Sequence, residues 1–270
     1  MAFILALVAI ASGALVTYLY DRDAHFSARL AAGACTGLAA LGLVGFVFAS
    51  FLGLTPASLF ISAVVIATPL TLLSKSDWRR RVRFDAAEAW RDIAGAVARP
   101  RPATTGALLL FVACALVFWQ VFGRAMFVRG GEIFTGVDNN LGDLPFHLSI
   151  ITGFVYGENF PPVHTEYAGA RLTYPFIVDF VAAMFVRAGA TLEGALLLEN
   201  FVLALALVGL LYRFALKLTG DRTAALITPA LALLSGGLGW WVFAREWSGG
   251  SLGLFELLGR LPRDYTITSD

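Results

Sequence analysis

The sequence is poor in charged residues. Asp, Glu, Lys and Arg make up 14% of its 270 residues, whereas hydrophobic residues make up 58% and the mean hydropathy is +0.75. A water-soluble globule needs more polar surface than this composition can supply. The composition therefore excludes a soluble globular protein and predicts a protein embedded in a membrane.

Groups needed for several common chemistries are scarce or missing. The two cysteines, Cys35 and Cys114, both fall in apolar runs, where a thiol is a small apolar filler and not part of a disulfide framework. The motifs of phosphate loops (G-x-x-x-x-G-K-[ST]) and zinc proteases (H-E-x-x-H) do not occur. Energy-coupled transport and zinc proteolysis by these motifs are thus unsupported. The net charge of +1 identifies no partner, and nucleic acid is not expected.

Long apolar runs take up most of the chain. About 20 helical residues cross the roughly 30 Å of hydrocarbon in a bilayer, and the runs must be helical because lipid offers no partner for backbone amides and carbonyls. A further run at 174–188 is shorter, and borderline for a span. We therefore expect an all-α, polytopic membrane protein with six or seven transmembrane helices and an outer loop that carries short interfacial helices. The six long runs are 2–20, 30–53, 57–74, 103–123, 192–212 and 223–243.

The distribution of charge predicts which loops are cytoplasmic. Residues 75–102 hold eight basic and four acidic side chains, whereas residues 124–173 hold three Arg and five acids. By the positive-inside rule the first segment is cytoplasmic and the second lies outside, as does the N-terminus. If the 174–188 run crosses the membrane, Arg213, Lys217 and Arg222 are outside, and if it is re-entrant they are inside; charge counting favours re-entry. The excess of Arg over Lys is typical of a GC-rich bacterial genome, which indicates a multi-pass protein of the bacterial cytoplasmic (inner) membrane.

Four segments follow from this pattern. Residues 1–74 form an N-terminal three-helix membrane unit, 75–102 a cytoplasmic basic connector, 103–243 a membrane core with the outer loop 124–173, and 244–270 a polar tail. Aromatic and aliphatic residues among the charges of the connector suit an amphipathic helix on anionic lipid, although a solvated loop explains them equally well.

The outer loop gathers the residues best able to do chemistry. Apolar residues recur every three or four positions from Asp143 to Tyr156, which predicts a short interfacial helix. Asp143 and His147 are four residues apart and so share one face. They could bind a divalent cation, or act as a base and its oriented partner; a helix-capping Asp and a His at the headgroup level are the plainer alternative. Asp138 offers a second acid nearby.

A carboxylate inside an apolar run is the second notable feature. Asp179 lies five residues into the 174–188 run, where an ionised carboxylate costs about 3 kcal/mol and needs a partner or water. Arg171 and Tyr174, just before it, are natural partners or could contact a phosphate. Glu199 is buried by the same reasoning, with an interhelical hydrogen bond as the alternative. Farther out, His164 and Glu166 either line an acceptor groove or are solvated.

This order of features resembles the GT-C superfamily of integral-membrane glycosyltransferases, in particular the branch of the oligosaccharyltransferase catalytic subunit; mannosyltransferases are related. The resemblance covers 103–219 and rests on a span, an outer D-x-x-x-H helix (Asp143 to His147), a Pro-containing loop, and Tyr174-Pro175 before an apolar helix with Asp179 inside it. That family has more spans, so the chain resembles part of such an enzyme. The resemblance also favours crossing by the 174–188 run.

The resemblance implies a function and roles for the site residues. It implies transfer of a sugar from a polyprenyl-phosphate-linked donor on the non-cytoplasmic face, with membrane lipid as the other partner. Asp143 or Asp138 would be the catalytic or metal-binding acid, and His147 or Arg171 would face the lipid-linked phosphate. A divalent cation, Mg or Mn, is an open expectation. Two other classes stay open, namely a lipid or solute transporter that uses Asp179 and Glu199 within the membrane, and a non-catalytic membrane subunit.

Overall fold

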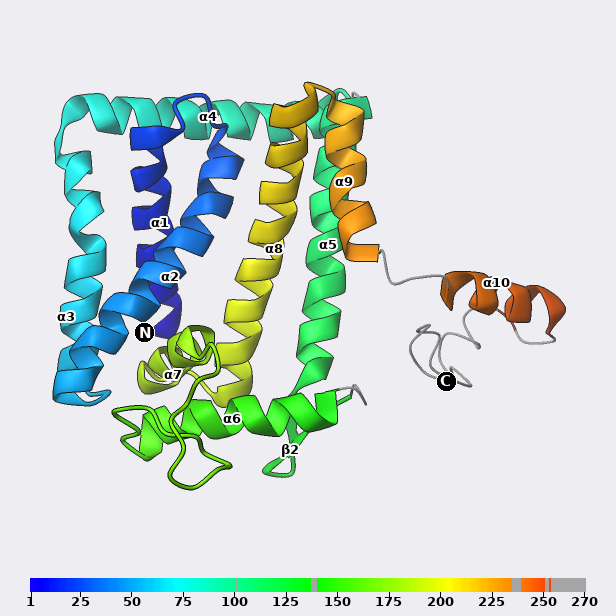
Figure 1. Cartoon of the computed structure of the whole chain (residues 1–270). Coiled ribbons are helices and arrows are strands. Elements are labelled where there is room, and N and C mark those ends of the chain that lie inside the picture. Colours follow the sequence, from blue (N-terminus) through cyan, green and yellow to red (C-terminus); the bar gives the residue numbers. More distant parts are fainter. Residues whose placement is uncertain (101, 137–139, 235–238, 251–252, 254–270) are drawn as a thin grey trace.

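The computed structural model describes residues 1–100, 102–136, 140–234, 239–250 and 253. The described chain is helical except for its connections and one short antiparallel hairpin, so the all-α expectation is confirmed (Figure 1). In chain order the elements are α1 (Ala2–Tyr20), α2 (Phe26–Leu52), α3 (Pro56–Ala67) with the 3₁₀ helix η1 (Thr68–Ser74), α4 (Ser76–Ala98), α5 (Pro102–Ala125), β1 (Phe127–Arg129), β2 (Glu132–Phe134), α6 (Asn140–Tyr156), α7 (Ile177–Arg187), α8 (Leu192–Thr219), α9 (Arg222–Leu234) and α10 (Gly239–Gly249).

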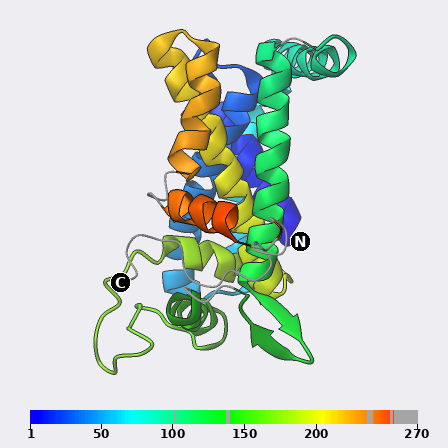
Figure 2. The ribbon, with the colours of Figure 1, turned by 90° about the vertical axis from the view of Figure 1, so that its right-hand side faces the viewer.

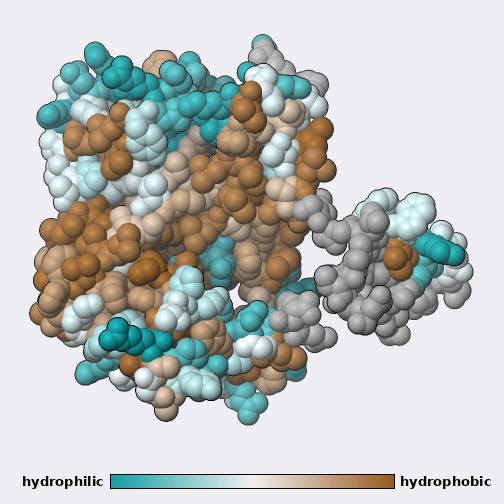
Figure 3. Space-filling model, in the orientation of Figure 1, coloured by the Kyte–Doolittle hydropathy of each residue, from teal (hydrophilic) through white to brown (hydrophobic). Residues whose placement is uncertain are grey.

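Five helices of the described chain are long and apolar enough to cross a membrane: α1, α2, α3 with η1, α5 and α8. They run side by side, with α4 lying across one end of the bundle and α6 across the other (Figure 1). We call these the α4 end and the α6 end. A broad hydrophobic band separates more polar surface at the two ends (Figure 3). The chain is therefore a multi-pass membrane protein, and the interfacial helix expected at Asp143–Tyr156 is present as α6.

The expected six or seven spans are not confirmed, because two apolar runs do not form spanning helices. The run 174–188 forms α7, whose 11 residues rise about 16 Å, roughly half of the hydrocarbon thickness. The run 223–243 is divided between α9, which has 13 residues, and the separate helix α10; residues 235–238 lie outside the described chain. Apolar composition alone did not reveal where these helices end.

The C-terminus of α8 lies at the α4 end. Arg213 of α8 forms an ion pair with Asp21, in the turn between α1 and α2, at 3.4 Å between Nη2 and Oδ1. Lys217 lies 3.9 Å from the same carboxylate oxygen. Since α8 starts at the α6 end (Figure 1), α7 turns back there without crossing. The structure thus agrees with the re-entrant alternative that charge counting favoured, and not with the crossing alternative.

Small residues on α2 allow two other helices to approach closely. A Cβ added at Gly33 or Gly37 would collide with the backbone of α1 near Ala14 or Ala9. One turn or two farther along, a Cβ at Gly42 would lie 2.7 Å from the Ile177 side chain of α7. Because these glycines have no side chain, α1 and α7 can pack closely against α2, and this packing sets the positions of both helices.

An aromatic cluster joins α6 and α7 to α2. Phe180 is fully buried, and its ring centroid lies 5.5 Å from that of Phe46 on α2 and 5.1 Å from that of Phe154 on α6. Phe160 and Phe176 complete the cluster. Edge-to-face packing of this kind holds its members in defined positions, so α6 and α7 form a fixed platform at the α6 end.

Candidate functional site

His147 and Asp179 form a hydrogen-bonded pair at the α6 end. The Nδ1 atom of His147, on α6, lies 2.8 Å from Oδ1 of Asp179, in the first turn of α7. The Asp179 residue is 4% exposed, whereas about a third of the His147 side chain is exposed. The N-terminal turn of a helix favours a carboxylate, because free backbone N–H groups there carry positive partial charge. The pair therefore reaches from the protein interior to the surface.

The partner of Asp179 is thus His147, and not Arg171 or Tyr174 as the sequence suggested. Burial raises the pKa of the Asp179 carboxyl, and the adjacent imidazole opposes this rise by its charge and its hydrogen bond. The imidazole of His147 therefore favours the carboxylate form of Asp179. Interaction between the two residues spans 32 positions in the chain, which explains why local spacing did not identify it.

Aromatic rings surround the imidazole of His147. The Tyr174 ring centroid lies 5.7 Å from it, and the Phe146 ring lies 5.1 Å from the Tyr174 ring. His164, from the loop between α6 and α7, is 5.6 Å from the Phe146 ring. Three of the residues chosen from the sequence, His147, Tyr174 and His164, therefore do gather at one place, and Phe146 connects them.

The loop that carries His164 is held by its own hydrogen bonds. The backbone N–H of His164 donates to the carbonyl of Ala170 at 2.8 Å, and the Asn159 side chain both donates to the Val163 carbonyl and accepts from its N–H at 2.9 Å. Ser149 of α6 bonds to Thr165 of the loop. His164 is therefore positioned by a folded loop that is fastened to α6.

Glu199 of α8 adds a second buried acid behind Asp179. It is 2% exposed, as its place in an apolar run predicted. The two carboxylates lie close enough for their charges to interact. Within the described chain, Oδ2 of Asp179 and Oε2 of Glu199 are buried and accept no hydrogen bond. Such oxygens have a strong capacity to accept a hydrogen bond from a ligand or water, or to bind a proton.

The acid expected to carry the chemistry, Asp143, does not pair with His147. It lies in the first turn of α6 and is exposed. In the described part of the chain no hydrogen bond or ion pair of its side chain occurs. The helical spacing placed both residues on α6 correctly, but α7 supplies a nearer carboxylate to the imidazole. The other candidate acid, Asp138, lies outside the described residues.

Two further candidates stay at the surface. Arg171 is exposed and contributes its backbone to a bridge with Val163, while Glu166 is exposed and its backbone N–H donates to Nδ1 of His164 at 3.2 Å. Neither side chain reaches the pair of His147 and Asp179 through a hydrogen bond or ion pair in the described chain. For Glu166 this agrees with the solvated alternative.

A ligand set for a divalent cation is not assembled by the described residues. No three side chains of His, Cys, Asp or Glu lie close enough together there to hold a metal ion. His147 also directs Nδ1 at Asp179 and has one ring nitrogen left. The expectation of Mg or Mn therefore gains no support from the described chain, in which Asp138 has no place.

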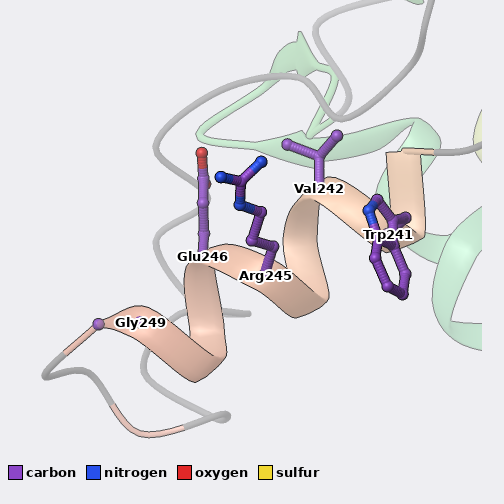
Figure 4. A pocket seen from close by; sticks show the side chains of 6 residues that line it. Trp241, Val242, Arg245, Glu246 and Gly249 are labelled. Carbon is purple, nitrogen blue, oxygen red and sulfur yellow. The ribbon is translucent and has the colours of Figure 1, made fainter.

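A hollow of about 470 Å³ lies elsewhere, on α10 (Figure 4). It is lined by Trp241, Val242, Arg245, Glu246, Gly249 and Gly250. Figure 1 shows α10 to one side of the bundle, away from α6 and α7. Since none of the candidate residues lines this hollow, it is not part of the site.

The chain was compared with protein families, with characterised proteins and with solved structures, and no match was found in any of the three. The fold and the site therefore define its class by themselves: a multi-pass membrane protein with a buried acid and a partly exposed histidine paired at one end of the bundle.

Proposed function

We propose that this protein is a membrane glycosyltransferase of the GT-C type, which transfers a sugar from a polyprenyl-phosphate-linked donor at the non-cytoplasmic face. The observation that carries the proposal is the 2.8 Å pair of His147 and Asp179 at the end of the bundle opposite the basic helix α4. A polyprenyl chain dissolves in the bilayer, so its phosphate arrives where the apolar band meets the polar loop. The resemblance of residues 103–219 to that superfamily supports the same class.

The pair suits general base catalysis. In the neutral tautomer that carries its proton on Nδ1, His147 donates to Asp179, 2.8 Å away, and its Nε2 is able to accept a proton. In the proposed reaction Nε2 takes the proton of the acceptor hydroxyl, the hydroxyl oxygen forms a bond to the anomeric carbon, and the bond from that carbon to the phosphate oxygen breaks. Polyprenyl phosphate leaves with the negative charge, and Asp179 stabilises the imidazolium.

The aromatic side chains of Tyr174 and Phe146, next to His147, are the proposed binding surface for the sugar. Tyr174 is 44% exposed and lies edge-on to both Phe146 and His147. Aromatic side chains with a polar tip are suited to the boundary between membrane and water. Asp143, one turn before His147 on the same helix, is the alternative base in this proposal. Arg171, three residues before Tyr174, is the candidate cation for the phosphate.

The test is release of polyprenyl phosphate, measured by mass spectrometry, in membranes that contain the full chain and are supplied with polyprenyl-phosphate-linked hexoses. His147→Ala should lower the rate by about 100-fold or more, in the range of general base catalysis. His25→Ala is the matched control, because His25 also pairs with an aspartate, Asp92 at 3.2 Å, but at the α4 end. Asp143→Asn distinguishes the two bases. Full activity of His147→Ala would remove His147 from the mechanism.

A second candidate function is transport, and the buried pair of Asp179 and Glu199 favours it. Two acids within an apolar bundle, each with an oxygen that accepts no hydrogen bond in the described chain, are also typical of an ion or proton pathway. For a transporter, Glu199→Gln should abolish flux of lipid or solute in proteoliposomes. No sugar transfer should be detected with either the wild type or His147→Ala. Transfer activity without flux would reject this candidate.

A further inference from the structure

One flank of α4 is fastened to the bundle by polar contacts. Arg29 of α2 is 1% exposed, and its Nε lies 3.6 Å from Oδ2 of Asp85. Its guanidinium also packs on the Tyr18 ring, at 3.7 Å from Cζ to the centroid, and the Tyr18 ring contacts that of Trp78 edge-on at 6.0 Å. Together with the pair of His25 and Asp92, these contacts use two of the acids of α4, namely Asp85 and Asp92.

The opposite flank of α4 is exposed and partly apolar. Trp90 is 70% exposed, Ile93 46% and Val97 69%. Together with Arg83 they recur at spacings of seven, three and four residues, so they form one stripe along the helix. Figure 2 views α4 nearly end-on at the top and shows it at the edge of the bundle, beside α5. The stripe therefore lies on a side of α4 that the bundle does not cover.

The charge on this side of α4 is basic. Because Asp85 and Asp92 face Arg29 and His25, they do not neutralise the arginines of the exposed side. Arg83 is exposed, and Arg79, one turn earlier, caps the end of η1 by donating to the carbonyls of Leu73 and Ser74, both at 2.8 Å. A helix side with arginines at one end and apolar residues along the rest is complementary to an anionic bilayer, in which negative phosphates lie outside the acyl chains.

The place of α4 in the fold makes a bilayer the partner that reaches this stripe. α4 lies crosswise at the end of five apolar helices, which is the depth of the headgroups when those helices cross a membrane (Figure 1). α5 starts at the C-terminal end of α4 and runs toward the α6 end (Figure 1). Its Leu109 and Leu116 are 62% and 64% exposed. The stripe is therefore next to the exposed apolar surface of a helix that is long enough to cross a membrane.

We propose that Arg83, Trp90, Ile93 and Val97 form a docking surface for anionic phospholipid at the α4 end. The apolar side chains enter the boundary between headgroups and acyl chains, and Arg83 contacts the lipid phosphate. This surface is at the far end of the bundle from His147 and does not depend on the proposed function.

The test uses the full chain in nanodiscs of phosphatidylcholine and phosphatidylglycerol, with bromine on the upper acyl chain of one lipid or of the other. The chain has six tryptophans, so the signal of Trp90 is taken as the difference in fluorescence between the wild type and Trp90→Phe. Trp90 should be quenched, and brominated phosphatidylglycerol should quench it more than brominated phosphatidylcholine at equal mole fraction. Absence of quenching by either lipid would overturn the proposal, as would equal quenching by both.

The contribution of charge is tested with Arg83→Gln. This variant should lower the preference for phosphatidylglycerol by about threefold to fivefold, the usual effect of one basic residue near an anionic surface, and Arg83→Lys should keep it. Arg129→Gln, which removes one arginine from β1 at the α6 end, is the matched control and should change nothing. About 1 M salt should reduce the wild-type preference, because it shortens the Debye length to about 3 Å. An unchanged preference in Arg83→Gln would overturn the role of Arg83.

Discussion

At the scale of single residues, two buried charged groups of the described chain, Asp179 and Arg29, each have one main ionic partner. Asp179 has His147, and Arg29 has Asp85 together with three oxygen atoms of Thr17, Asp21 and Arg22. Removing one partner of a buried pair leaves the other with its full desolvation cost. These positions are therefore the ones at which a single substitution has the largest effect.

His147→Ala should destabilise the protein. It leaves Asp179 buried without its hydrogen-bond donor, at a cost of about 1–3 kcal/mol, and the melting temperature of the purified chain in detergent should fall. His25→Ala removes a half-exposed pair, of the kind worth about 0–1 kcal/mol, and should change the melting temperature little. Equal melting temperatures for wild type and His147→Ala would show that Asp179 does not need the imidazole.

The site was partly predictable at this scale. Asp179 and Glu199 were identified correctly as buried acids because an ionisable residue within an apolar run is costly, whatever the fold. The partner of Asp179 was not predictable, because it depends on how α6 crosses α7. The roles of Asp143, Arg171 and Glu166 remain hypotheses.

At the scale of helices, close approach of α1 and α2 depends on glycine. Gly37→Ala should destabilise the protein by about 1–3 kcal/mol, since its Cβ would collide with the carbonyl of Ala9 and an overpacked interface must separate. Gly123→Ala on α5 is the matched control, because nothing lies within 4 Å of a Cβ there. Thermal unfolding in detergent compares the two. The prediction is wrong if Gly37→Ala and Gly123→Ala have the same melting temperature.

Helix positions were easier to predict than helix ends. The runs 2–20 and 103–123 agree with α1 and α5 to within two residues, because a spanning helix must be both apolar and about 20 residues long. The run at 223–243 was expected to form one span and is divided between α9 and α10, whereas the run at 174–188 was left open between crossing and re-entry. The run at 174–188 forms a shorter helix, α7, which packs against Gly42 of α2. Packing between segments that are distant in the sequence cannot be predicted from the residues of one segment alone.

At the scale of the whole molecule, the two ends of the bundle differ in chemistry. The α4 end carries the basic connector and the ion pair of Arg213 with Asp21, whereas the α6 end carries His147 and its neighbours. Charge counting placed the basic connector and the outer loop on opposite sides of the membrane, and the structure has α4 and α6 at opposite ends of the bundle. Charge counting also favoured re-entry of the 174–188 run, which agrees with the position of Arg213 of α8 beside Asp21 at the α4 end.

Cysteine labelling tests this arrangement. In a background with Cys35 and Cys114 replaced by Ala, Glu166→Cys should react with a membrane-impermeant maleimide in intact cells, whereas Arg83→Cys and Lys217→Cys should react only after permeabilisation. Lys217→Cys is the decisive position, since it shares the α4 end only if α7 does not cross. Labelling of Lys217→Cys together with Glu166→Cys in intact cells would contradict the re-entrant path.

The most direct test of the central claim is a double-mutant cycle on sugar transfer. If His147 and Asp179 act as one unit, His147→Ala and Asp179→Asn should each lower the rate of polyprenyl phosphate release strongly, and the double variant should be no slower than the slower single variant. Losses that multiply in the double variant would contradict the account, because the two residues would then act independently.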